Sequence, residues 1–381
     1  MVKSVNIIAP SGASVQLEHL IILAHGIDGD TSDLKAVRDE ILLQANKGVE
    51  VFQTDVNCNS RTHAGVRRCC DRIWEVLLPR LKALCAASTK RLRVSFIGHS
   101  FGGLCLRCLA TKLFVSDLRD SVLLDTLVCI ASPHLGCRLL GRGGKGGVAP
   151  LMVTFGPSIM RAGLRLIKGR TGPELLLDND SLETLSDGDN CDALRAFRRR
   201  IAYCNGCGDW LVNVESASLL AAEELAAVLP PSAAACQRPE ARVIWRPSEE
   251  TTSASSSWPP TLALSPEAEE SAGGGGQRTL VLRPLPRTWD SSETVRSHST
   301  WDDRQATRGR RAAAILQQLR SCGDWELHLC HFLPKRSSFA GGVFSPHIDL
   351  VAHPKCTQRY GLEVVRHLAA RMVEGSPKDR L

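Results

Sequence analysis

The chain has 381 residues, of which 43% are hydrophobic and 23% charged, values typical of a globular protein. Fibrous, collagen-like and wholly disordered architectures are therefore excluded. The 47 basic and 40 acidic side chains leave a net charge of +7. This mild excess suits weak attraction to anionic surfaces such as lipid headgroups, and it falls short of the clustered basic and aromatic residues of a nucleic-acid binder. We therefore expect no nucleic-acid partner.

The length of the apolar runs and the number of cysteines indicate the cellular compartment of the protein. No apolar run reaches the roughly 18–20 residues of a membrane span, and the first twenty residues lack the apolar centre of a signal peptide. The 15 cysteines are odd in number and scattered, which favours free thiols in a reducing compartment. These features predict a cytoplasmic protein, with peripheral contact to membranes or lipid droplets as an option.

Short apolar runs alternate with helical patterns along the chain. Strands are predicted at 19–25, 49–55, 91–98, 123–132 and 325–332. Helices are predicted at 64–85, 103–114 and 362–373, and residues 193–204 are predicted to form a helix that runs into a strand. This alternation is typical of an α/β fold, with a mostly parallel sheet and helices on both faces.

Residues 231–310 differ from the rest of the chain, because they are rich in Ser, Ala, Pro and Gly and show no apolar period. Such a composition cannot bury enough apolar surface to offset the entropy lost on ordering. We therefore expect a low-complexity, disordered insertion at 231–310. Residues 1–230 and 311–381 would then form one hydrolase domain around it.

The strongest motif is Gly98-His99-Ser100-Phe101-Gly102, a G-x-S-x-G string. It directly follows the strand predicted at 91–98 and opens the helix predicted at 103–114. This order is that of a nucleophile elbow, in which the central serine projects above the sheet. Ser100 is therefore predicted as the nucleophile, and the backbone N–H of Phe101 as one donor to the oxyanion.

From the elbow outward, the chain resembles the putative serine esterase family, lipase-like α/β-hydrolases of fungi, plants and protozoa. The matching segments are Leu23-Ala24-His25-Gly26, FIGHSFGGL (96–104), ASPHLG (131–136), YCNGCGDWLV (203–212) and HIDLV (347–351) with the final helix. They run in family order over residues 19–230 and 311–373. The resemblance implies an α/β-hydrolase fold and an ester hydrolase that works without a cofactor.

The second oxyanion donor should come from the loop after an early strand. The segment 25–29, His-Gly-Ile-Asp-Gly, follows the first predicted strand and matches the family's oxyanion loop. We assign the donor to the N–H of Ile27, with Gly26 as the alternative. The side chain of His25 is expected to brace this loop rather than to react.

In this fold the acid follows the nucleophile along the chain and the histidine comes last. Asp209 is predicted as the acid, because it follows the strand-like residues 200–205 and a Gly-Cys-Gly turn, and the resemblance implies the same place. Asn213 stands where the family often has proline, which predicts a looser loop. The alternative is that Asp209 only caps the next turn.

Six histidines follow Asp209: His298, His328, His331, His347, His353 and His367. His347 is predicted as the base, since it lies in a loop between the last strand and the last helix, as the family's histidine does. The preceding Ser345-Pro346 differs from the acidic-alanine pair expected there. His353 is the alternative.

Two cysteine pairs have a spacing seen in zinc sites, Cys105-x-x-Cys108 and Cys204-x-x-Cys207. The first pair lies on the helix behind the nucleophile, where cysteine is a good small core residue. We therefore expect no metal ion.

A lid-like region is predicted at about 137–190, between the elbow and the acid. Its stretch 148–170 combines apolar and cationic side chains, which fits either contact with a lipid surface or a core helix with a solvated basic face. Taken together, the sequence predicts a serine esterase or lipase that cleaves carboxylic esters of lipids, such as acylglycerols, in lipid degradation. The alternatives are a thioesterase, a non-lipid carboxylesterase and a non-catalytic interaction protein with this fold.

Overall fold

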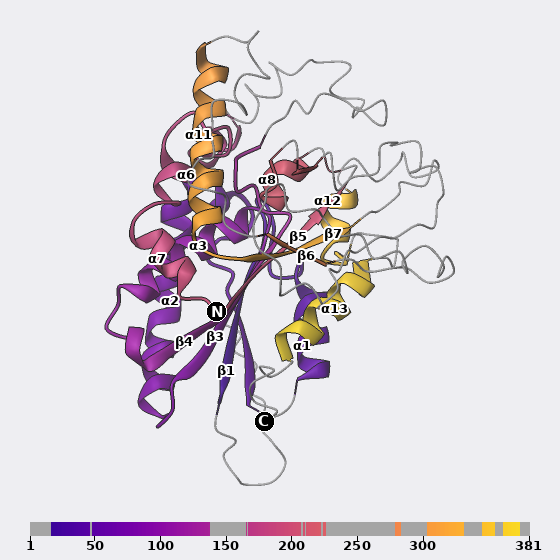
Figure 1. Cartoon of the computed structure of the whole chain (residues 1–381). Helices are drawn as coiled ribbons and strands as arrows, with labels where there is room; N and C mark the ends of the chain where they lie inside the picture. Colours follow the sequence, from indigo (N-terminus) through magenta and orange to yellow (C-terminus); the bar gives the residue numbers. More distant parts are fainter. Residues whose placement is uncertain are drawn as a thin grey trace, which may run out of the picture.

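The computed structural model describes residues 17–45, 48–137, 165, 167–206, 209, 211–221, 224–225, 279–282, 303–330, 345–354 and 361–373. Within these residues, one sheet of seven strands has the order β2-β1-β3-β4-β5-β7-β6 (Figure 1). The strands are β1 His19–Ala24, β2 Val49–Gln53, β3 Leu92–His99, β4 Val122–Ile130, β5 Arg199–Asn205, β6 Thr279–Leu282 and β7 Trp325–Cys330. The first six in spatial order are parallel, and β6 pairs antiparallel with β7.

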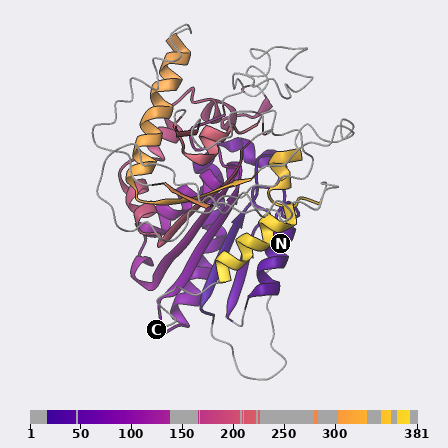
Figure 2. The same ribbon diagram turned by 45° about the vertical axis from the view of Figure 1, so that its right-hand side comes forward.

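Helices cover both faces of the sheet. On one face, α1 Lys35–Gln44 packs against α13 Gly361–Val373, and the turned view keeps these two helices side by side (Figure 2). On the other face, α2 Val66–Ala86, α3 Phe101–Phe114 and α7 Asp189–Arg195 pack together. The remaining helical elements are η1 Asn59–Ala64, η2 Arg119–Ser121, α5 Thr171–Leu175, α6 Ser181–Thr184, α8 Val214–Ser218, α11 Asp303–Ser321 and α12 Ser345–Asp349.

The central strands are buried on both sides, which explains their continuous apolar sequences. Successive side chains of a strand point to opposite faces. In β1, Leu20 and Ile22 join the apolar core under α2 and α3, whereas Ile21 and Leu23 join the core under α1 and α13. Each face therefore has its own core, as expected for a parallel sheet between two helical layers.

The predicted strands and helices correspond to β1, β2, α2, β3, α3, β4, α7, β5, β7 and α13, with ends that shift by a few residues. The prediction of a mostly parallel sheet with helices on both faces is confirmed. Helix α1 was not predicted, because only Val37 and Ile41 of its ten residues are buried and its apolar period is weak.

The segment 231–310 differs from the prediction in two places. Residues 279–282 form β6, an edge strand on β7, and residues 303–310 form the first turns of α11, whose later residues Ile315 and Leu319 are buried in the core. Pairing with an existing strand and continuation of an anchored helix supply the order that the local composition lacks. The other residues of the predicted insertion lie outside the described ones.

No helix in the described part of the chain is long and apolar enough to span a membrane. The cysteines in the same part are free thiols, as predicted, and most of them are buried.

Candidate active site

The order of the strands reverses beside β1. The chain runs from β1 outward to β2 and then returns to β3 on the other side of β1. In parallel sheets, the loops at the carboxyl ends of two such strands diverge and leave room for a ligand between them. The loop 25–29 after β1 and Ser100 after β3 both lie at this point.

Ser100 occupies a strained turn between β3 and α3. Its φ of 53° and ψ of −124° lie in a region that ordinary residues avoid, at a cost of about 1–3 kcal/mol. Small neighbours make the turn possible: a Cβ on Gly98 would lie 2.4 Å from Gly103 Cα, and one on Gly102 would lie 2.2 Å from the carbonyl oxygen of Ala24. The backbone therefore has the geometry of a nucleophile elbow.

The turn after β1 packs directly against this serine. A Cβ on Gly26 would lie 3.2 Å from Ser100 Cβ. The N–H of Gly29 donates to the Gly26 carbonyl at 3.2 Å, and the N–H of Asp28 donates to Thr62 Oγ1 at 3.0 Å. Two N–H groups of the turn are thus engaged, and neither of these two bonds involves the N–H of Ile27.

Phe101 is the first residue of α3, so the helix itself provides no acceptor for its N–H. The positive end of the helix dipole lies at the same place. The predicted donors Phe101 and Ile27 therefore come from two elements that meet at Ser100. His25 donates from Nδ1 to the Gly26 carbonyl at 2.9 Å, which agrees with the bracing role expected of it.

Asp209 and His347 are brought together from distant parts of the chain. His347 Nδ1 lies 2.7 Å from Asp209 Oδ2, and both side chains are buried. The other carboxylate oxygen accepts the N–H groups of Leu211 at 3.1 Å and Val212 at 3.0 Å. Asp209 therefore does cap the next turn, the alternative considered above, and pairs with the histidine at the same time.

Electrostatics keep Asp209 ionised. Burial alone would raise the pKa of its carboxyl, but the charge and hydrogen bond of His347, the Val212 N–H and the Asn205 amide outweigh burial and lower the pKa below its usual value. Asn205 Nδ2 donates to Asp209 Oδ2 at 3.0 Å. Sequence reasoning did not assign a role to Asn205, although it ends the strand that carries the acid.

His347 lies in the short helix α12 rather than in the predicted loop. Pro346, which suits the first turn of a helix, precedes it, and one helical turn is too short to produce an apolar period. The carbonyl of His347 accepts a hydrogen bond of 3.1 Å from Nε2 of His99, and the two rings are 4.9 Å apart. Burial and then the charge of His347 lower the pKa of His99 to about 3, so His99 is neutral.

The other histidines have different partners. His353, the alternative base, contacts Asp33 Oδ1 at 2.9 Å through Nε2. His328 in β7 stacks on Tyr203, and His367 Nδ1 lies 2.8 Å from the Tyr203 hydroxyl. His298 and His331 lie outside the described residues.

A second group of serine, histidine and aspartate lies within the strands, on the amino-terminal side of Ser100. His19 Nε2 is 2.7 Å from Ser95 Oγ, and Ser95 Oγ is 3.5 Å from Asp125 Oδ2. Here the serine stands between the histidine and the acid, whereas a catalytic triad requires the histidine in the middle. Ser95 and Asp125 are fully buried inside strands. Burial and then Arg93 lower the pKa of His19 to about 4. This group has the features of a structural network.

In the described part of the chain, no group of three or more His, Cys, Asp or Glu side chains is arranged to hold an ion. Cys105 and Cys108 of the first predicted pair are buried on α3, where they face α2. Cys207 of the second pair lies outside the described residues. Within the lid-like region, residues 138–164 and 166 also lie outside them.

Strand order, elbow and buried acid–histidine pair define an α/β-hydrolase. The model of the putative serine esterase family (DUF676) matches residues 14–220, and the chain belongs to this family. Among curated proteins, it is 28% identical over 219 residues to "Putative lipase ROG1" of Saccharomyces cerevisiae, covering 53% of this chain and 29% of that protein. It is also 28% identical over 222 residues to "Putative lipase YDL109C" of the same yeast, covering 54% and 31%.

The chain therefore spans about a third of the length of the curated relatives it matches. Among solved structures, it is similar to lipase BlEst2 of Bacillus licheniformis, with 11% identity, a TM-score of 0.32 and coverage of 52% of this chain and 69% of that one. For lipase B of Aspergillus fumigatus the identity is 15%, the TM-score 0.32 and the coverage 52% and 40%.

Proposed function

We propose that the protein is a serine hydrolase that cleaves carboxylic esters of lipids through an acyl-enzyme on Ser100, with Asp209 as the acid and His347 as the base. The observation that carries this proposal is the 2.7 Å contact between Asp209 and His347, residues 138 positions apart in the sequence. It lies at the end of the sheet where β3 presents Ser100 in a strained turn.

The buried carboxylate determines the tautomer of the histidine. Asp209 accepts a hydrogen bond from the Nδ1–H group of His347, so Nε2 of the neutral imidazole carries the lone pair. Nε2 would take the proton of Ser100 Oγ as that oxygen attacks the ester carbonyl, and Asp209 would stabilise the imidazolium that forms. The proton would then pass to the departing alcohol, and water activated by His347 would release the acyl group.

The negative charge of the tetrahedral intermediate develops on the former carbonyl oxygen. The N–H groups of Phe101 and Ile27 are the donors that we propose for it, because they lie at the start of α3 and in the turn against Ser100. Loss of one such donor costs about 10²–10³-fold in kcat in other hydrolases.

The lipid character of the substrate is supported by the two yeast relatives, each of which is named as a putative lipase. The net charge of +7 is compatible with contact at an anionic lipid surface, which is part of the proposal. The alternatives that the experiments below separate are a thioesterase, a non-lipid carboxylesterase and a non-catalytic interaction protein.

The test is labelling with a fluorophosphonate probe followed by peptide mapping, in the wild type and in Ser100→Ala and Ser95→Ala. We expect the probe on Ser100, loss of labelling and of ester hydrolysis in Ser100→Ala, and retention of both in Ser95→Ala. Labelling at Ser95, or undiminished turnover by folded Ser100→Ala, would refute the assignment.

A substrate panel then identifies the class. Short- and long-chain nitrophenyl esters, an acylglycerol in micelles and an acyl thioester are compared at matched concentrations. Preference for long acyl chains and micellar substrate supports a lipase, whereas preference for the thioester or for short soluble esters supports the alternatives. A protein that neither labels nor hydrolyses would be a binding module.

A further inference from the structure

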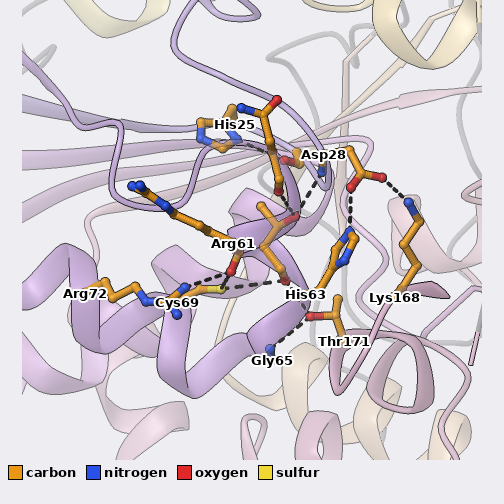
Figure 3. Close-up of polar contacts among 12 residues, drawn as sticks. His25, Asp28, Arg61, His63, Gly65, Cys69, Arg72, Lys168 and Thr171 are labelled. Carbon is orange, nitrogen blue, oxygen red and sulfur yellow. Dashed lines mark hydrogen bonds and ion pairs between the residues drawn. The ribbon is translucent and has the colours of Figure 1, made fainter. Parts of the chain in front are cut away.

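The carboxylate of Asp28 is held from two sides, directly beside the turn that packs on Ser100. His63 Nε2 donates to Oδ1 at 2.5 Å, and Lys168 Nζ donates to Oδ2 (Figure 3). These partners stand 35 and 140 positions further along the chain. One carboxylate therefore connects the loop after β1, the 3-10 helix η1 and the residues that precede α5.

The backbone of Asp28 is in the left-handed region, with φ of 56°. For a residue other than glycine, this backbone conformation costs roughly 1–2 kcal/mol. Asp28 follows Ile27 within the turn closed by the Gly29–Gly26 hydrogen bond, and its own N–H is bound by Thr62 Oγ1. The N–H of Ile27 belongs to the Gly26–Ile27 peptide group, whose carbonyl accepts the Gly29 N–H. Rotation of the Asp28 backbone would displace Gly29 and so release this peptide group.

Lys168 reaches Asp28 from a backbone that is fixed independently of the ion pair. The N–H of Arg170 donates to the carbonyl of His63 at 3.0 Å. Thr171 Oγ1 donates to the carbonyl of Thr62 at 2.6 Å, and both threonines are buried. Removal of the lysine's charge would leave these contacts in place, so a substitution there perturbs the carboxylate alone.

Stability is a poor explanation for the arrangement. The side chain of Asp28 is 43% exposed, and those of His63 and Lys168 are 20% and 23% exposed. Ion pairs in such surroundings contribute about 0–1 kcal/mol. Two hydrogen-bond donors, one of them the Lys168 ammonium, converge on the carboxylate of a residue with a strained backbone in the predicted oxyanion loop. This arrangement instead favours a role in geometry.

We propose that His63 and Lys168 are positioning residues, which act through Asp28 to fix the turn at 26–29 and thereby aim the N–H of Ile27 at the oxyanion. This inference rests on the proposed function. It assigns to the esterase site two residues that touch neither the substrate nor Ser100.

The test compares four single variants of the full chain, and the double variant Lys168→Met/Asp28→Asn, on a soluble short-chain ester. Lys168→Met removes the charge at similar length, and Lys168→Arg restores it. Asp28→Asn removes the charge but keeps a residue that tolerates the left-handed backbone. Asp39→Asn is the matched control, because Asp39 also pairs with a lysine, Lys35, but on the exposed surface of α1.

We expect Lys168→Met and Asp28→Asn each to lower kcat at least tenfold and to leave KM within about twofold of the wild-type value. A misdirected donor stabilises the transition state less well, whereas binding of the ground-state substrate does not depend on it. The affinity of a trifluoromethyl ketone, whose adduct carries an oxyanion, should fall in parallel. Lys168→Arg should recover to within about threefold, and Asp39→Asn should match the wild type. The double variant should lose no more than either single one, since both act through one contact.

Unchanged kcat in Lys168→Met and Asp28→Asn, with an active wild type, would overturn this inference alone. A rise in KM without a fall in kcat would also overturn it, because it would indicate a role in substrate binding. Absence of Ser100-dependent turnover in the wild type would instead overturn the proposed function, and this inference with it. Thermal unfolding of each variant checks that the fold is retained.

Discussion

Replacement of Asp209 by asparagine tests the proposed acid with little change in shape. The carboxylate accepts four hydrogen bonds or contacts: two backbone N–H groups at Oδ1, from Leu211 and Val212, and Asn205 and His347 at Oδ2. An amide has one oxygen and one NH₂ group, so it cannot accept at both ends. The single amide oxygen of the variant can therefore face either the backbone N–H groups or His347, but not both.

The backbone N–H groups determine the orientation of this amide. If the amide oxygen turned to His347, the NH₂ group would face the two backbone N–H donors of Leu211 and Val212, and each buried donor left unpaired costs about 1–3 kcal/mol. The oxygen should therefore stay on the backbone, and the NH₂ group of residue 209 should donate to Nδ1 of His347. The amide of Asn205, which donates to Oδ2 in the wild type, can turn so that its oxygen accepts the second N–H of that group. The proton of the imidazole would then lie on Nε2, which is the wrong tautomer for accepting the proton of Ser100.

The penalty for the productive orientation is thus about 2–6 kcal/mol, the sum for two donors. This corresponds to a fall in kcat of roughly 30-fold to 10⁴-fold, the upper end matching the effect of the same change in serine proteases. The assay is steady-state hydrolysis of a short-chain ester. The matched control is Asp33→Asn, since Asp33 contacts His353 at 2.9 Å, and it should stay within about threefold of the wild type.

A loss smaller than tenfold in folded Asp209→Asn would refute this reasoning. Inactivation by Asp33→Asn together with an active Asp209→Asn would identify His353 as the base instead.

Three further outcomes follow from the geometry. His99→Phe removes the hydrogen bond to the His347 carbonyl, worth about 1 kcal/mol, and should lower kcat roughly fivefold or more while fluorophosphonate still labels the protein; equal kcat and pH profiles would contradict it. Gly102→Ala would place a Cβ 2.2 Å from the Ala24 carbonyl oxygen and should lower the midpoint of urea unfolding and abolish labelling. The pKa of His19 is about 4 in the folded protein and 6.5 in the unfolded chain, so the unfolded state binds more protons between these pH values. The free energy of unfolding should therefore fall by about 2 kcal/mol as the pH drops from 7 to 5. Urea titrations should show a smaller fall in His19→Gln.

The sequence is most informative where a short segment dictates its own geometry. The elbow could be predicted because two glycines around Ser100 are needed wherever a strand turns so sharply into a helix. The buried strands could be predicted because β1 and β3 are enclosed on both faces and are rich in apolar residues. Both signals are local, and neither depends on residues elsewhere in the chain.

Contacts between distant segments could not be predicted in the same way. The partners of Asp28 come from positions 63 and 168, and no periodicity connects them. Helix α12 escaped detection because one turn carries no apolar period. The pairing of Asp209 with His347 was expected from the resemblance, whereas the support that Asn205 gives to the acid appears only once β5 and the following loop are seen together.

The two groups of serine, histidine and aspartate show why residue types alone do not define a site. Ser95 is held inside β3 between His19 and Asp125, and its side chain is fully buried. Ser100, five residues later on the same strand–helix unit, lies where the strand has ended and α3 begins. A buried hydroxyl within a strand can satisfy its partners but cannot meet a substrate carbonyl, whereas the strained turn exposes one to the positive end of a helix dipole. Whether a residue lies inside a strand or just beyond its carboxyl end thus separates a stabilising network from a candidate catalytic one.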